Sequence, residues 1–189
     1  MQFHRPLPID HFNKKVPYFV RPSDYSYIVG FNSKTPIIDH KMENKDKIVE
    51  LLNSIIQLEL AGVVRYTHYS LMVFGYNRIP IVSWLREQAD ESLRHAQEAG
   101  EMVTHLGGHP SLKIGKLLES HKHDIKEILL ESLKHESTGL DVYKELLQEV
   151  EGKSVMLEEY ARSHILEEEA HCGEVDKMLR NPGTLESVM

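Results

Sequence analysis

The sequence contains a single cysteine, Cys172, so neither an intrachain disulfide nor a thiolate-rich zinc site can form. We expect Cys172 to be a small core residue. Excess positive charge is also missing, because 22 Lys and Arg residues stand against 29 Asp and Glu residues, a formal net charge of −7. A negative surface repels nucleic-acid phosphates, so no nucleic-acid partner is expected.

Long apolar runs are absent from the sequence as well. Glu59 and Arg65 interrupt the most apolar stretch, and residues 1–6 lack the apolar run of a signal peptide. These features predict a cytoplasmic protein with no membrane partner. Hydrophobic residues still make up 41% of the 189 residues, which is enough for one domain with a sizeable core.

Three parts of the chain differ in pattern. Residues 1–45 contain five prolines between short apolar pieces, and because proline disfavours helix we predict an extended N-terminal arm there. Residues 46–180 carry apolar residues at three- and four-residue steps, which is typical of helices. Residues 181–189 begin with Asn-Pro-Gly, a stop signal for the last helix, and form a C-terminal tail.

Four helices are predicted, at 46–74, 81–106, 124–150 and 154–180. Asp124 and Ser154 are the expected N-caps of the last two. The connection 107–123 is longer than the others and is expected to contain a short helix at 112–119. Two short joins and one long one favour an all-α antiparallel four-helix bundle with a long crossover between the second and third helices.

Charged or metal-binding side chains interrupt the apolar stripe of each predicted helix. They are Glu59 in the first helix, His95 in the second, Glu136 in the third, and Glu168 and His171 in the fourth. Ionised carboxylates in an apolar core cost roughly several kcal/mol each unless a cation pairs with them. The pattern therefore predicts a metal centre. Carboxylates with one imidazole per metal suit iron or manganese better than structural zinc, and the choice between iron and manganese stays open.

The spacing of these residues predicts one site rather than two. Glu59 and His95 are 36 residues apart, and Glu136 and His171 are 35 apart. Each helical hairpin should therefore bring one Glu and one His to a similar height. Glu168 and His171 lie three apart, on one helix face.

These segments resemble the ferritin-like di-iron carboxylate family, and bacterioferritins in particular, over about residues 46–180. The matching segments are Leu58-Glu59-Leu60-Ala61 with Tyr66 and Met72, then His95-Ala96, then Glu136, then Glu167-Glu168-Glu169-Ala170-His171. The family takes one Glu from each of two helices and a Glu-x-x-His from each of the other two. The resemblance implies two iron ions per subunit, bridged by one carboxylate, with one histidine on each ion and a nearby tyrosine. By position, the bridge is Glu168, the histidines are His95 and His171, the other carboxylates are Glu59 and Glu136, and the tyrosine is Tyr66.

The function implied by the resemblance is oxidation of Fe(II) to Fe(III) with dioxygen, that is ferroxidase activity, and iron storage in a homo-oligomer such as a ferritin-type shell. A first alternative is a di-iron oxygenase or peroxidase acting on an organic substrate, which needs an apolar channel to the metals. A second alternative is a helical interaction protein whose site has decayed and binds no metal.

Two positions depart from the family pattern. Ser92 stands three residues before His95, where the family has its second bridging Glu, and Glu91 stands four before. Both positions lie within about 60° of His95 around the helix axis, so Glu91 is the expected substitute ligand. Leu93 stands where bacterioferritins carry the methionine that binds haem, so haem is not expected.

Other histidines are assigned by their distance from helix ends. His68 and His164 are expected near the core, where they would support the site. Five more are expected on the surface: His105, His109, His121, His123 and His135.

Overall fold

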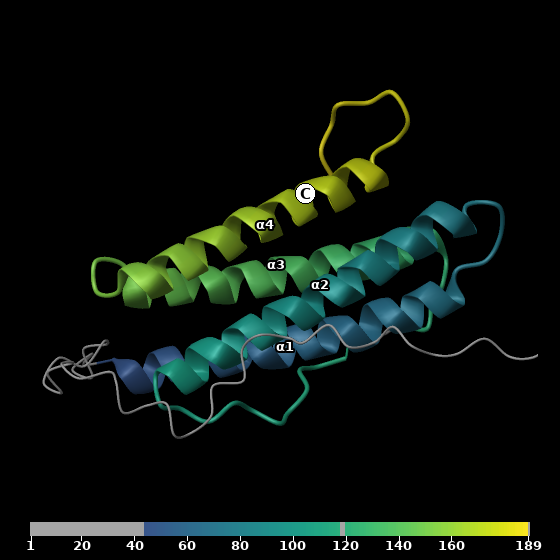
Figure 1. The fold of residues 1–189 in the computed structure, drawn as a ribbon. Coiled ribbons are helices and arrows are strands. Elements are labelled where there is room, and N and C mark those ends of the chain that lie inside the picture. The colour runs from purple at the N-terminus through teal and green to yellow at the C-terminus, as the bar shows by residue number, and fades with distance from the viewer. Residues whose placement is uncertain (1–43, 118–119, 189) are drawn as a thin grey trace, which may run out of the picture. The chain divides into compact units, whose positions relative to one another are not determined.

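The computed structural model describes residues 44–117 and 120–188, so the arm predicted at 1–45 lies almost wholly outside the described residues. Within this range the chain forms helices and no strand (Figure 1). The four helices are α1 (Lys45–Met72), α2 (Arg78–His105), α3 (Ile125–Val150) and α4 (Val155–Leu179). The prediction of an all-α four-helix bundle is confirmed. None of these helices offers an apolar stretch long enough to cross a bilayer.

The helices pack as two hairpins, α1 with α2 and α3 with α4, and α1 also packs against α3 (Figure 1). Both predicted N-caps are confirmed: Asp124 accepts a hydrogen bond from the Glu127 amide at 3.2 Å, and Ser154 accepts one from the Leu157 amide at 3.4 Å. Helix α2 begins earlier than predicted and takes Pro80 into its first turn. Proline is tolerated there because the first amides of a helix have no partner within the helix.

The crossover between α2 and α3 differs from the prediction. The short helix expected at 112–119 is wrong at 112–117, which carries no helix, while 118–119 lie outside the described residues. The Gly115 amide donates to the Gln57 carbonyl of α1 at 2.7 Å, so a backbone donor that a local helix would use is bonded to α1 instead. A Cβ on Gly115 would lie 2.7 Å from that carbonyl oxygen, so only glycine permits this approach.

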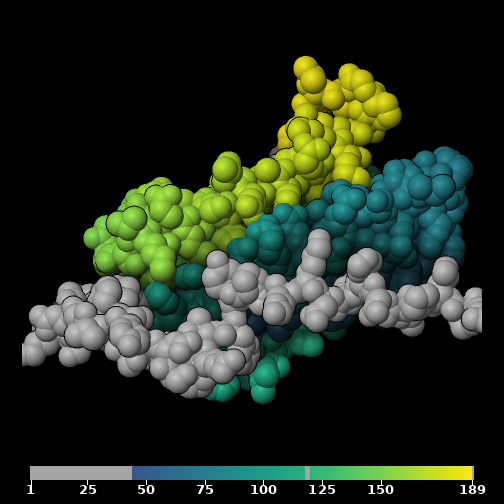
Figure 2. Space-filling model, viewed as in Figure 1, coloured from purple at the N-terminus to yellow at the C-terminus, as the bar shows by residue number. Residues whose placement is uncertain are grey.

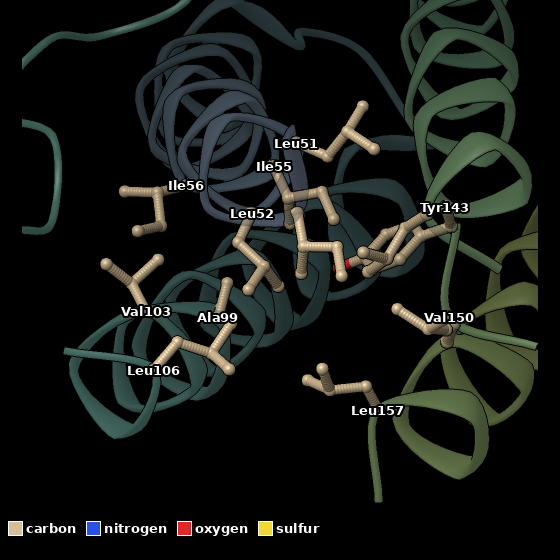
Figure 3. Close-up of a cluster of buried hydrophobic side chains, with 13 residues drawn as sticks. Leu51, Leu52, Ile55, Ile56, Ala99, Val103, Leu106, Tyr143, Val150 and Leu157 are labelled. Atoms are coloured by element: carbon tan, nitrogen blue, oxygen red, sulfur yellow. The ribbon is translucent and has the colours of Figure 1, made fainter. Parts of the chain in front are cut away.

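Two apolar clusters occupy different heights of the bundle. The first joins the N-terminal half of α1 and the C-terminal half of α2 to the adjoining ends of α3 and α4, and Figure 3 shows its side chains meeting between the helices. The second joins the C-terminal half of α1 to the N-terminal halves of α2 and α3. Fully burying one such Leu or Ile stabilises the fold by about 1.5–3 kcal/mol. Glu59, His95 and Glu136, which are described next, lie between the two clusters in the sequences of α1, α2 and α3.

The C-terminal tail folds back on the end of α4. The carboxylate of Asp176 accepts hydrogen bonds from the Val188 amide at 2.6 Å and from the Ser187 hydroxyl at 2.9 Å, and it also pairs with Arg180. Figure 2 shows residues 180–188 as a lobe at that end of the helix. Leucine and valine side chains of the tail are exposed, so the polar contacts at Asp176 hold the tail in place.

Candidate metal centre

All four helices place an acidic or imidazole side chain at the middle of the bundle. These side chains are Glu59 from α1, His95 from α2, Glu136 from α3, and Glu168 and His171 from α4. All are buried except His171, which is half-buried. The helical period turns each of them to the inner face, as the stripes in the sequence predict.

The first group of possible ligands comprises Glu59, His95 and Glu168. One ligand atom from each lies within 4.8 Å of the others. The Nδ1 atom of His95 is 3.4 Å from Glu59 Oε1 and 3.4 Å from Glu168 Oε1. Two carboxylates and one imidazole therefore converge from three different helices.

The second group comprises Glu136, Glu168 and His171, with the same mutual limit of 4.8 Å. Glu168 belongs to both groups, as a bridging carboxylate must. Its Oε2 atom is buried and has no hydrogen-bond partner among the described residues. Such an orphaned buried oxygen is destabilising unless a cation binds it, so the donor set fits a pair of metal ions.

The three buried carboxyl groups differ in pKa, and therefore in how readily each is ionised. Burial and the charge of Glu168 raise the pKa of Glu136 well above its ordinary value. Burial raises the pKa of Glu59 too, and hydrogen bonding to His95 offsets only part of this. Burial alone would raise the pKa of Glu168, but hydrogen bonds with His95 and Glu136 hold it below its ordinary value. Without a cation, the negative charge therefore concentrates on Glu168.

Two tyrosines bond to the carboxylates in a crossed arrangement. The Tyr66 hydroxyl of α1 donates to Glu136 of α3, and the Tyr143 hydroxyl of α3 donates to Glu59 of α1 at 3.1 Å. Burial raises the pKa of Tyr143 well above its ordinary value, so this hydroxyl stays a donor. The sequence prediction missed Tyr143. The available signal was spacing, since each tyrosine lies seven residues after a glutamate, Tyr66 after Glu59 and Tyr143 after Glu136.

Ser92 of α2 lies where the family pattern has its second bridging Glu, and Glu91 precedes it. Ser92 is buried, and its Oγ lies 2.6 Å from where a Cβ on Gly62 would stand, so α1 and α2 approach closely there. Glu91 points instead toward α4, with its Oε2 3.2 Å from Nε2 of His171. Arg94 also pairs with Glu91 at 3.3 Å. Glu91 thus contacts a candidate ligand without joining either group of converging atoms.

One of the remaining histidines contradicts the prediction. His135 was expected on the surface and is only 7% exposed, because it lies on the part of α3 that packs against α1. Its ring packs edge-on against Tyr66, with centroids 6.2 Å apart. His164 is buried near the core as expected, and so is Cys172. Of the other histidines expected on the surface, His105, His109 and His121 are exposed and His123 is half-buried. His68, which was expected near the core, is also half-buried.

A family model and two bacterioferritins match large parts of the four-helix bundle. A sequence model described as ferritin-like domain matches residues 49–182, well over half of the chain. The chain is 32% identical to a bacterioferritin from Brucella melitensis over 106 residues, which are 55% of this chain and 64% of that protein. The matched stretch thus spans less than two thirds of that relative's length. A bacterioferritin from Desulfovibrio desulfuricans is 25% identical over 133 residues, covering 69% of this chain and 72% of the relative.

Solved structures share the fold. A ferritin-like, diiron-carboxylate protein from Bacillus anthracis superposes with a TM-score of 0.69 at 20% identity, covering 72% of this chain and 98% of that one. A dodecameric thioferritin from Bacteroides fragilis gives 0.67 at 22% identity, covering 71% and 85%. Together with the match over residues 49–182, these similarities show that the chain belongs to the ferritin-like domain family.

Proposed function

We propose that the protein binds two iron ions between its helices and oxidises Fe(II) to Fe(III) with dioxygen, as a bacterioferritin-like iron-storage protein. The observation that carries this proposal is the position of Glu168, which belongs to both groups of converging ligand atoms and keeps one buried oxygen without a partner. The two bacterioferritins among its relatives support iron as the metal.

Each side chain has a role in this proposal. Glu59 and His95 hold one ion, Glu136 and His171 hold the other, and Glu168 bridges them. Two Fe(II) ions at bridging distance can pass electrons to the same dioxygen molecule. Tyr66 and Tyr143 fix the orientation of the two outer carboxylates through their hydroxyl groups.

Glu91 completes the ligand set in this proposal. Its Oε2 stands 3.2 Å from Nε2 of His171, and it is the carboxylate of α2 nearest in sequence to Ser92, where the family has a Glu. Its side chain is half-buried and pairs, among the described residues, with the exposed guanidinium of Arg94 and with His171, so it can turn toward a metal ion. A metal ion bound by Glu136, Glu168 and His171 would thereby gain a fourth protein ligand.

Storage further requires an assembly with an internal cavity. We propose that the chain forms a closed homo-oligomer, because a solved structure of the same fold is described as dodecameric. The alternative reading, an oxygenase or peroxidase for an organic substrate, has no observation in its favour. Three clefts on the described surface are lined by other residues, one of them by side chains between Arg78 and Asp90 of α2, and not by the carboxylates of the centre.

The test is anaerobic loading of the purified protein with Fe(II), followed by admission of air. Ferric absorbance and iron per chain are measured for the natural protein, for Glu168→Gln and for Glu169→Gln. Glu169 is the matched control because it is the next residue on α4 and lies exposed on the surface, paired with Lys144. We expect Glu168→Gln to slow oxidation by at least roughly 100-fold, and Glu169→Gln to leave it unchanged.

The amount of iron taken up decides between the readings. Uptake far above two ions per chain supports storage. Uptake that stops at about two ions per chain contradicts storage and favours the oxygenase or peroxidase reading. Absence of iron binding in the natural protein contradicts the whole proposal and indicates a decayed site.

A further inference from the structure

A second cluster of metal-binding side chains lies beside the di-metal centre. It comprises His95, His164 and Glu167, each with one ligand atom within 4.8 Å of the others. His95 belongs to both places, because its ring turns Nδ1 toward Glu168 and turns Nε2 toward Glu167, 3.0 Å from that residue's Oε2. We call this cluster the outer site.

His164 presents an unused lone pair to the outer site. The side chain is only 3% exposed, and its Nδ1 has no hydrogen-bond partner in the described part of the chain. On the other edge of the ring, Nε2 lies 3.1 Å from Glu98 Oε2. A neutral imidazole has one donor and one acceptor nitrogen, so the bond to Glu98 places the proton on Nε2 and the lone pair on Nδ1.

Two acceptors face each other as a result. The Nδ1 lone pair of His164 lies 3.7 Å from the Oε2 atom of Glu167. Facing acceptors repel unless a cation lies between them. Imidazole nitrogens with one carboxylate are a donor set that binds divalent transition-metal ions.

The ring of His164 is held in place by other rings. Tyr143 stacks on it with centroids 5.0 Å apart and an interplanar angle of 18°. Tyr160 and His95 meet it edge-on, with centroids at 4.4 Å and 4.5 Å. A ligand held this way needs little reorganisation when a metal ion binds.

The guanidinium of Arg94 takes the cation's position in this structure. Its Nη2 lies 2.9 Å from His95 Nε2 and 3.1 Å from Glu167 Oε2, and its Nη1 lies 3.0 Å from Glu98. The Arg94 side chain is 46% exposed, so it can turn into solvent at little cost. Arg94 is thus a competitor for a metal ion at the outer site.

We infer that His164, Glu167 and His95 form a third, outer binding site for a divalent transition-metal ion, and that metal binding there displaces Arg94. Neutral His95 has a single lone pair. An ion at the outer site is therefore bound by His164 and Glu167, and by His95 as well while the adjoining position of the di-metal centre is empty. Exposure falls from Glu98 and Glu167 at the surface to His164 and His95 inside, so the outer site lies on the solvent side of the centre.

The test uses Co²⁺, which is stable in air as a divalent ion in such sites, with the full-length protein. Crystals soaked with Co²⁺ are measured at the cobalt absorption edge, and calorimetry gives the number of ions per chain. The variants are Glu167→Gln and His164→Gln, which remove outer ligands, Arg94→Gln, which removes the competitor, and Glu136→Gln, which changes only the di-metal centre. Glu167 is partly exposed, so its substitution guards against a folding defect caused by changing the buried His164.

We expect a cobalt peak at bonding distance from His164 Nδ1 and Glu167 in the natural protein. The affinity for cobalt at this site should fall by at least roughly tenfold in Glu167→Gln and His164→Gln, and rise by roughly tenfold in Arg94→Gln. In Glu136→Gln the cobalt peak should remain. Absence of cobalt at His164 in both the natural protein and Arg94→Gln would overturn the inference. Because Glu136→Gln keeps the outer site, a non-functional di-metal centre and a non-existent outer site give different results.

Discussion

At the scale of single residues, the centre depends on how unequal its acidic groups are. Glu59 and Glu136 each receive a tyrosine hydroxyl and have raised pKa values, whereas Glu168 has a lowered pKa and an oxygen with no partner in the described part of the chain. Glu168, the carboxylate proposed to bridge the two ions, is therefore the most readily ionised of the three and keeps one oxygen available for a metal ion. The two flanking acids keep their orientation through tyrosines even without a metal ion.

Removing a tyrosine hydroxyl tests that orientation. Tyr143→Phe deletes the donor to Glu59 within a fully buried environment, so we expect the free energy of unfolding to fall by about 1–2 kcal/mol. Tyr160→Phe is the comparison variant, because it removes a neighbouring hydroxyl that interacts with Tyr143 and leaves the donor to Glu59 in place. Urea unfolding of the metal-free proteins measures both. Equal losses in the two variants would show that the bond to Glu59 is not what stabilises this position.

At the scale of helices, local signals were readable from the sequence and contacts between distant segments were not. The N-caps Asp124 and Ser154 act within three residues of themselves, and the sequence predicts both. The crossover near Gly115 bonds to Gln57, far away in the chain, and the sequence predicts a helix there instead. The burial of His135 likewise depends on how α3 packs against α1, which no local pattern reports.

The end of α4 gives a prediction about pH. Hydrogen bonds from the Val188 amide, Arg180 and Ser187 lower the pKa of Asp176 from about 3.8 to about 2. Because the folded-state pKa is the lower one, this carboxylate stabilises the docked tail above about pH 4, and the stabilisation is lost as the pH falls toward 2. We therefore expect Asp176→Asn to destabilise the protein at pH 7, with a difference from the natural protein that shrinks between pH 4 and pH 2.

Urea unfolding of the natural protein and Asp176→Asn across this pH range provides the measurement. Glu174→Gln serves as the control, since Glu174 is exposed on the same helix and pairs with Lys177 on the surface. A difference between the natural protein and Asp176→Asn that stays constant down to pH 2 would contradict the assignment of the tail contact to the charged carboxylate.

At the scale of the whole bundle, two apolar clusters flank a polar layer along α1, α2 and α3, and a pair of metal ions would neutralise the carboxylates of that layer. The sequence predicts this layer because Glu59, His95, Glu136 and Glu168 each follow from a helical period and a symmetric spacing. It could not predict the outer site, since His95 and Arg94 of α2 meet Glu167 of α4 only in the assembled bundle. The same holds for Glu91, whose contact with His171 joins those two helices.

The central claim is that Glu168 bridges two metal ions, and diffraction at the iron absorption edge from anaerobically loaded crystals tests it most directly. The account predicts two iron peaks per chain, each bound to one oxygen of Glu168, with Glu59 and His95 on one ion and Glu136 and His171 on the other. A single iron peak bound to only one of these sets, or iron bound without Glu168, would contradict it.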